Sequence, residues 1–461
     1  MTERLFPEDF VWGVATSAQQ IEGATTADGR SESIWDRYAS IPGNIDDGSD
    51  PSVACDHYRR WREDLGLLSD LGVNAYRFSI AWPRVLPRGV GGVNAAGLDF
   101  YDALVDALLE RNIQPFVTLY HWDLPQVLQD RGGWTSRDTA MAFADYAEVV
   151  ATRLGDRVTH WITHNEPWCI ATLGYEQGDH APGHENPTEA LRAAHHVLLS
   201  HGWAMERIRA LSPRAKVGIV LNLTPSEAAS DRPADYDAAR WFDGFFNRWY
   251  LDPLLRGSYP RDAVEDRVAA GHLAAPLLPF VLSGDLQAMS LPRDRCVVNH
   301  CSRVAMRAPG AGGRGAVPQA PPEALTDMGW EVYPEGLAPL LVRLHREYGA
   351  PDLYITENGC AYADSPDSKG HIADSRRIAF MESHLGGAHR AIQAGVPLKG
   401  YSAWSLLDNF EWGQGYEKRF GLYWVDYPTQ KRIPKDSAHA YRAIIAANGL
   451  AAGSPSGARS V

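Results

Sequence analysis

Two hydrophobic patterns alternate along this chain: short apolar runs without charge, and longer segments with apolar residues three or four positions apart. The first pattern is typical of a buried strand and the second of a helix with one apolar face. Strands are predicted at residues 10–17, 75–80, 115–120, 160–164, 216–221, 296–299, 353–356 and 400–405. Helices are predicted at residues 56–71, 97–111, 138–154, 188–211, 237–255, 261–271, 335–348 and 375–394.

Regular alternation of strands and helices predicts a parallel sheet with right-handed crossovers. Eight units, and no glycine-rich dinucleotide fingerprint after the first strand, favour a closed (β/α)8 TIM barrel over a doubly wound sheet. We expect one α/β catalytic domain over residues 1–449 with long βα loops on its catalytic face. Residues 24–54 and 308–323 are predicted to be loops, and residues 450–461 a disordered tail.

Composition indicates which kinds of partner the protein can bind and which cellular compartment suits it. The formal charge of −13 argues against nucleic acid, which needs a basic face. Five cysteines without a CxxC pair favour a reduced, cytoplasmic protein, and neither a signal segment nor a membrane-spanning run is expected. The 15 Trp and 19 Tyr could be core residues or a stacking surface for sugars. The oligomeric state stays open, a homo-oligomer included.

Polar and aromatic residues follow seven of the eight predicted strands. In a TIM barrel the carboxyl ends of the strands form the catalytic face, so these side chains are expected to converge there. They are Gln20, Arg77, His121, Trp122, Asp123, Asn165, Glu166, Trp168, Asn299, Glu357, Asn358, Trp404, Asp408, Asn409, Glu411 and Trp412.

Glu166 and Glu357 stand out because each directly follows a buried strand. A strand-end glutamate can simply meet solvent, but two carboxylates facing one bond are the groups that glycoside hydrolysis requires. Retention of configuration needs carboxyls about 5–5.5 Å apart and inversion about 6.5–9.5 Å, a choice that spacing along the chain leaves open. The histidines form no zinc-site signature, and no Gly-x-Ser-x-Gly elbow or P-loop is present, so no metal or cofactor is implied.

Three motifs resemble those of the glycoside hydrolase family 1 β-glucosidases. They are Thr163–Pro167 around Glu166, Ile355–Gly359 around Glu357, and the segment Trp404–Trp412. The resemblance extends from Phe6 to about residue 445. It implies a retaining β-glycosidase that removes terminal β-D-glucosyl residues, or β-galactosyl or β-fucosyl residues, from small glycosides or oligosaccharides.

The resemblance also implies roles for individual residues. Glu357 would be the nucleophile, with Arg77 beside it, and Glu166 the acid/base. Trp168 and Trp330 would line the leaving-group side, although packing at the barrel rim is an alternative for both. A carboxylate at Glu411 would repel phosphate, which favours a neutral glycoside over a phosphorylated one. The substrate-binding residues would be Gln20, His121, Trp122, Asn165, Asn299, Trp404, Glu411, Trp412 and Phe420.

The segment around the sixth strand departs from the family pattern. Cys301 stands where the family has a tyrosine that hydrogen-bonds the nucleophile, and a thiol is a weaker donor. Arg293 and Arg295 are also unusual in a barrel strand, which leaves a shortened or displaced strand as an alternative here. Two alternatives therefore stay open: a catalytically weakened sugar-binding relative, and a transglycosidase that uses the same residues.

Overall fold

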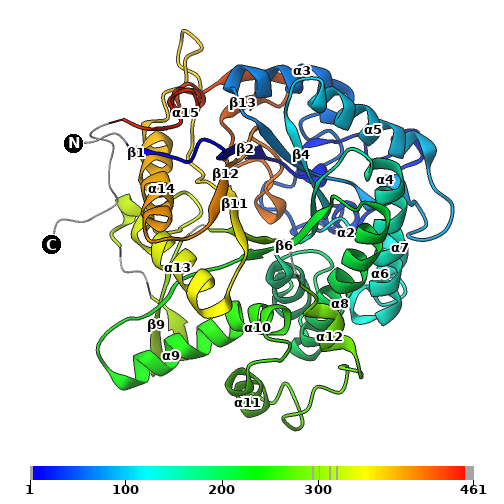
Figure 1. Cartoon of the computed structure of the whole chain (residues 1–461), viewed down its shortest axis with the longest axis vertical. Coiled ribbons are helices and arrows are strands. Elements are labelled where there is room, and N and C mark those ends of the chain that lie inside the picture. Colours follow the sequence, from blue (N-terminus) through cyan, green and yellow to red (C-terminus); the bar gives the residue numbers. More distant parts are fainter. Residues whose placement is uncertain (1–3, 293–294, 301, 311–312, 318–319, 452–461) are drawn as a thin grey trace.

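The computed structural model describes residues 4–292, 295–300, 302–310, 313–317 and 320–451. Eight parallel strands close into a barrel in the order β11-β12-β2-β3-β4-β5-β6-β8 (Figure 1). Their bounds are β2 Val11–Ala15, β3 Ala75–Ser79, β4 Gln114–Tyr120, β5 His160–Asn165, β6 Lys216–Asn222, β8 Arg295–Asn299, β11 Asp352–Asn358 and β12 Leu398–Trp404. The predicted fold class is confirmed, and β8 takes its place between β6 and β11 despite its unusual sequence.

Helices surround the barrel, and each begins or ends where the local sequence favours it. Asn186 caps the longest helix, α8, by accepting hydrogen bonds from two backbone N–H groups, and Gly72 ends α3 in the left-handed conformation. The larger helices are α3 His57–Leu71, α5 Ala95–Leu109, α7 Arg137–Leu154, α8 Pro187–Leu211, α9 Pro233–Asp243, α10 Trp249–Leu255, α11 Arg261–Ala269, α13 Leu337–Tyr348, α14 Ser375–Gln393 and α15 Asp436–Ala447. Shorter ones are α1 Ala18–Ile21, α2 Ile34–Ala39, α4 Trp82–Val85, α6 Gln126–Gln129 and α12 Asp285–Met289.

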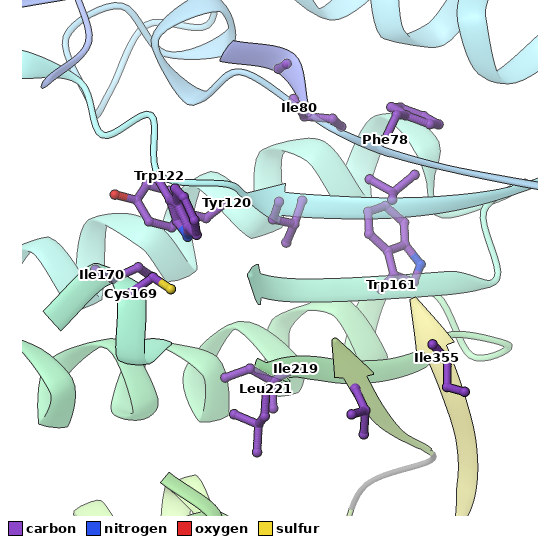
Figure 2. Close-up of a cluster of buried hydrophobic side chains, with 14 of the residues drawn as sticks. Phe78, Ile80, Tyr120, Trp122, Trp161, Cys169, Ile170, Ile219, Leu221 and Ile355 are labelled. Atoms are coloured by element: carbon purple, nitrogen blue, oxygen red, sulfur yellow. The ribbon is translucent and has the colours of Figure 1, made fainter. Parts of the chain in front are cut away.

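The barrel interior changes from apolar to polar along the strands. One layer inside the barrel consists of Ala75, Phe116, Ile162, Val220, Val297 and Tyr354. Side chains on one face of a strand recur every second residue, so Arg77, Thr118 and Asn299 rise two positions beyond this layer. All three are buried, and they form part of the polar floor beneath the barrel mouth. On the outer faces, residues such as Phe78, Trp161 and Ile219 pack toward the helices (Figure 2).

Residues 308–323 differ from the predicted exposed loop. Strand β9 Val304–Gly310 pairs with β10 Gly313–Ala316 and with the short strand β7 Ser226–Ala228, giving a separate three-stranded sheet. Met306 of β9 is buried against Ala238 and Ala239 of α9, which lies beside β9 in Figure 1. The many glycines and prolines of this segment predicted a loop, because they have low strand propensity. Packing against α9 stabilises the hairpin instead.

Three further boundaries differ from the predictions. The predicted loop 24–54 contains α2, which Ser33 and Asp36 begin with a reciprocal capping box. The helix predicted at 237–255 starts at Pro233, and the π-helical segment η4 Gly244–Arg248 interrupts it. Leu450 is buried and belongs to β15 Gly449–Leu450, which pairs with β1 Arg4–Leu5.

In the part of the chain that the structure describes, every helix is too short or too polar to span a bilayer.

Candidate active site

A cavity of about 880 Å³ opens at the carboxyl ends of the barrel strands. It is lined by residues that the sequence singled out: His121, Trp122, Asn165, Glu166, Trp168, Asn299, Trp330, Glu357, Trp404, Glu411, Trp412 and Phe420. The structure therefore brings into one cavity residues that are separated by up to three hundred positions in the chain. Gln20 and Arg77 lie behind the cavity wall and contact it through Glu411 and Glu357.

Glu357, near the end of β11, contacts a buried cation. Nη1 of Arg77 on β3 donates a hydrogen bond to its carboxylate Oε1, and both side chains are almost fully buried. The Nε of Arg77 donates to Thr118 at 3.1 Å, so the guanidinium is fixed from the neighbouring strand β4. Glycine is required just beyond, because a Cβ on Gly359 would overlap the carbonyl oxygen of Trp404.

Glu166, directly after β5, has neutral donors on both carboxylate oxygens. Asn299 Nδ2 donates to Oε1 at 2.8 Å, and the thiol of Cys169 donates to Oε2 at 3.1 Å. A hydrogen bond from Asn299 also acts on Glu357, so one amide lies between the two carboxyls. The two glutamates therefore share one hydrogen-bonding neighbour and line the same cavity.

Burial dominates the electrostatics of the cavity. It raises the pKa of Glu357, and the charge of Glu166 adds to this rise, whereas the guanidinium of Arg77 opposes it and favours the ionised carboxylate. Burial also raises the pKa of Glu166, against the hydrogen bonds from Asn299 and Cys169 and the charge of Arg77. The pKa of Glu411 rises to about 8 through burial and the charges of the other two glutamates. Three carboxyls in one buried cavity thus resist simultaneous ionisation.

Asn165 connects the floor of the cavity to its wall. Its Oδ1 accepts from Arg77 Nη2 at 2.8 Å and from Asn299 Nδ2 at 3.1 Å. Its Nδ2 lies 3.1 Å from Nε2 of His121, and its backbone oxygen accepts from Nε1 of Trp122 at 2.8 Å. Burial lowers the pKa of His121 well below its ordinary value, so this imidazole is neutral. Among the described residues, Nδ1 of His121 has no hydrogen-bond partner.

The opposite wall comes from the segment after β12. Gln20, which lies in α1 rather than at a strand end, donates from Nε2 to Glu411 Oε2 at 3.2 Å and to the backbone oxygen of Phe410 at 3.0 Å. The ring of Trp412 packs against Trp122, with ring centres 4.5 Å apart, and Trp404 lies nearly parallel to the imidazole of His121. An aromatic surface therefore runs along one side of the cavity, next to a carboxylate and an amide.

Three residues of the site have a left-handed backbone that only glycine adopts without cost. The φ angles are 78° at Trp122, 48° at Glu166 and 52° at Trp412. This conformation costs an ordinary residue about 1–2 kcal/mol, which the surrounding packing has to offset. The strain turns each side chain out of the strand direction and into the cavity.

The cavity entrance includes residues that the sequence did not indicate. Trp168 packs on Phe246 with ring centres 4.3 Å apart, and Trp330 lies 5.9 Å from Phe420 on the other side. The lining residues that sequence reasoning missed include Cys169, His180, Asn222, Phe246 and Arg303. Asn222 directly follows the predicted strand at 216–221, and Cys169 comes three residues after Glu166, so position at a strand end could have indicated these two. None of the other three directly follows a predicted strand, and only the tertiary contacts reveal them. Cys301, predicted to support the nucleophile, lies outside the described residues, as does Arg293.

Nearly the whole chain matches one known family. The family model described as Glycosyl hydrolase family 1 matches residues 2–450. This chain belongs to glycosyl hydrolase family 1. The match spans every described strand of the barrel, and the cavity lies at the carboxyl ends of these strands, the face that carries the active site in TIM-barrel enzymes.

Similar proteins of the family cover almost the same length. Beta-glucosidase A of Acetivibrio thermocellus is 46% identical over 98% of this chain and 100% of its own. Beta-glucosidase A of Thermotoga maritima is also 46% identical, over 98% of this chain and 100% of its own. A solved beta-glucosidase from Thermotoga maritima in complex with glucoimidazole superposes with a TM-score of 0.93, at 45% identity, and covers 97% of this chain and 100% of that one.

Proposed function

We propose that this family 1 protein is a retaining β-glycosidase of the β-glucosidase type, which hydrolyses terminal β-D-glucosyl residues by double displacement. Glu357 attacks the anomeric carbon while Glu166 protonates the leaving oxygen, and Glu166 then takes a proton from water to release the sugar. The observation that carries the proposal is the presence of these two carboxyls in one cavity, where Arg77 is hydrogen-bonded to Glu357 and the described hydrogen bonds to Glu166 come from Asn299 and Cys169.

The first step requires a proton on Glu166 and none on Glu357. Two coupled carboxyls in one buried site share a proton near neutral pH. Arg77 favours the ionised form of Glu357 by direct contact, whereas the hydrogen-bond donors to Glu166 are the uncharged Asn299 and Cys169. We therefore assign the shared proton to Glu166, in agreement with its role as acid.

The remaining residues suit a neutral sugar ring. The unsatisfied Nδ1 of His121 and the carboxyl of Glu411, which the amide of Gln20 holds in place, can bind hydroxyl groups, and Trp404 and Trp412 offer ring faces for stacking. Asn165 and Asn299 would bind the hydroxyl next to the anomeric carbon, where hydrogen bonds strengthen in the transition state. Trp122 and Phe420 would complete the sugar site, and Trp168 and Trp330 would contact the leaving group.

The first test is substitution of the nucleophile. Glu357→Gln keeps the size and polarity of the side chain but removes the attacking charge, so kcat for an aryl β-glucoside should fall about 10³-fold or more. Glu206→Gln, on an exposed position of α8, is the matched control and should keep wild-type activity. Normal turnover by the Glu357→Gln protein would refute the assignment of the nucleophile.

Substrate and acceptor are tested separately. Initial rates with aryl β-glucosides, β-galactosides and β-fucosides rank the three sugars that these residues can accommodate. Product analysis at high concentrations of an alcohol or sugar acceptor measures transglycosylation against hydrolysis. Binding of glucose without turnover of any of these glycosides would favour the sugar-binding alternative instead.

A cytoplasmic location is also part of the proposal. Cys55 and Cys360 are buried thiols, and the described residues contain no disulfide. Buried thiols of this kind persist in a reducing compartment. Fractionation of source cells, followed by an assay with an aryl β-glucoside, tests the location.

A further inference from the structure

Glu166 is hydrogen-bonded from one side by a residue that the double displacement does not otherwise use. Its Oε1 accepts from Asn299 at 2.8 Å, and its Oε2 accepts from the thiol of Cys169 at 3.1 Å. We propose that Cys169 is a positioning residue, which orients Glu166 for its acid/base role through this S–H···O hydrogen bond. The proposal rests on the proposed function.

The backbone fixes the thiol in this place. The chain turns sharply at Glu166, whose φ is 48°, and enters the π-helical segment η3 Cys169–Gln177. The backbone N–H of Ile170 donates to the oxygen of Glu166 at 3.2 Å, which holds the turn closed. Cys169 is therefore directed back toward the strand ends; Figure 2 shows its sulfur pointing toward the end of the strand that carries Trp161.

A second contact orients the thiol hydrogen. Nδ2 of Asn222, at the end of β6, donates to the sulfur of Cys169 at 3.5 Å. Because the amide occupies the acceptor side of the sulfur, the S–H is directed at the carboxylate. Asn222, Cys169 and Glu166 are thus linked by two consecutive hydrogen bonds, which run from the end of β6 to the acid/base. Asn222 and Cys169 both line the cavity.

Other titratable and charged groups also surround Glu166. Glu357 and Glu411 line the same cavity, Arg77 lies behind its wall and its charge opposes the rise in the pKa of Glu166, and His121 is neutral. Burial raises the pKa of Tyr250 of α10, so its phenol stays protonated. A donor to the carboxylate favours the ionised form of Glu166, so its loss should make Glu166 retain its proton to higher pH.

Packing alone is the competing explanation. Cys169 is only 7% exposed and belongs to the main hydrophobic core, where a cysteine can act as a small apolar residue. Three substitutions separate the two roles. Cys169→Ala removes both volume and donor, Cys169→Val restores apolar volume without a donor, and Cys169→Ser keeps a donor in a side chain of similar shape.

The experiment is the pH profile of kcat/KM for an alkyl β-glucoside, whose leaving group must be protonated. Cys169→Ala and Cys169→Val should move the alkaline limb upward by about 0.5–1 pH unit, and Cys169→Ser should leave it close to wild type. A dinitrophenyl β-glucoside serves as the control, since its leaving group departs without protonation, and its alkaline limb should stay unchanged in all three variants.

Two outcomes would overturn the proposal: an alkaline limb unchanged in both Cys169→Ala and Cys169→Val, or a shift in Cys169→Ser equal to that in Cys169→Ala. Using two donor-free variants keeps the test decisive if one of them fails to fold. The proposed function fails separately, if the wild-type protein turns over no β-glycoside at all.

Discussion

At the scale of single residues, the two glutamates of the cavity differ in the charge of the groups that contact them. Glu357 meets the guanidinium of Arg77, whereas Glu166 meets an amide and a thiol. One carboxyl is thereby suited to stay ionised and the other to carry a proton, although both line the same cavity. The chemistry of each glutamate follows from its neighbours on other strands rather than from its own place in the chain.

Replacing Glu166 should affect substrates according to their leaving groups. Glu166→Ala is expected to lower kcat/KM about 10²–10⁴-fold for an alkyl β-glucoside, which needs a proton donor. A dinitrophenyl β-glucoside should lose far less, because its first step needs no acid. Initial rates with the two substrates measure the difference.

Azide provides an independent check of this role. A small anion can enter the space left by Glu166→Ala and attack the sugar without a general base, so azide should accelerate release and give a β-glucosyl azide. Glu206→Ala, on the outer surface, should show neither effect. Equal losses for both leaving groups, with no response to azide, would contradict an acid/base role.

At the scale of elements, the segment that carries Glu411 and Trp412 is held by buried charges behind it. Asp408 accepts from Nζ of Lys435 at 2.9 Å, from Arg419 at 2.7 Å and from the backbone N–H of Gly421 at 2.9 Å. Lys435 also donates to Asp364 at 3.0 Å and is completely buried. This network joins the segment after β12 to the start of α15.

Removing the lysine charge should therefore loosen the sugar-binding segment. Lys435→Met is expected to lower the free energy of unfolding by about 3 kcal/mol, because it leaves buried carboxylates with one cation fewer. Arg419 still faces Asp408, which limits the loss. Urea unfolding measures this change, and KM for an aryl β-glucoside should rise as Glu411 and Trp412 lose their support.

A nearby lysine offers the matched control. Lys431 is exposed on strand β14 Lys431–Pro434, so Lys431→Met should change the unfolding free energy by less than about 0.5 kcal/mol. If Lys435→Met were as stable as the control, the buried network would have no part in holding the segment.

At the scale of the whole molecule, the two ends of the described chain close the base of the barrel together. β1 pairs with β15, and Asn448 accepts from Nε1 of Trp12 at 2.9 Å while it donates to the backbone oxygens of Phe6 and Pro7. Leu450 is buried beside them. These contacts join β2, the first barrel strand, to the residues that follow the last helix.

Two truncations test where the folded domain ends. Deleting residues 448–461 removes the buried Leu450 and the hydrogen bonds of Asn448, and should cost about 3 kcal/mol of unfolding free energy. Deleting residues 452–461 should leave stability and activity unchanged, as expected if the last stabilising contacts of the domain are those of residues 448–450. Urea unfolding of the two proteins gives the comparison, and a large loss in the shorter deletion would contradict this boundary.

Much of this protein could be predicted from local sequence patterns. The eight barrel strands and the larger helices other than α15 were predicted within a few residues, because a buried parallel strand and an amphipathic helix each leave a periodic signal. The polar residues at the strand ends were predicted to converge because the carboxyl ends of all strands in a closed parallel barrel lie on one face. The β9–β10 hairpin was missed because its stability comes from α9, a distant segment.

What the sequence by itself determined is the repeat of strand and helix, the motifs around Glu166 and Glu357, and membership of family 1. The tertiary structure alone decided how those residues differ: the contact of Arg77 with Glu357, the donors Asn299 and Cys169 on Glu166, and the strained backbone at Trp122, Glu166 and Trp412. The physical reason is that charge, burial and hydrogen bonding depend on distances between separate strands. Periodicity identifies which residues reach the cavity, but only the closed barrel determines which of them touch.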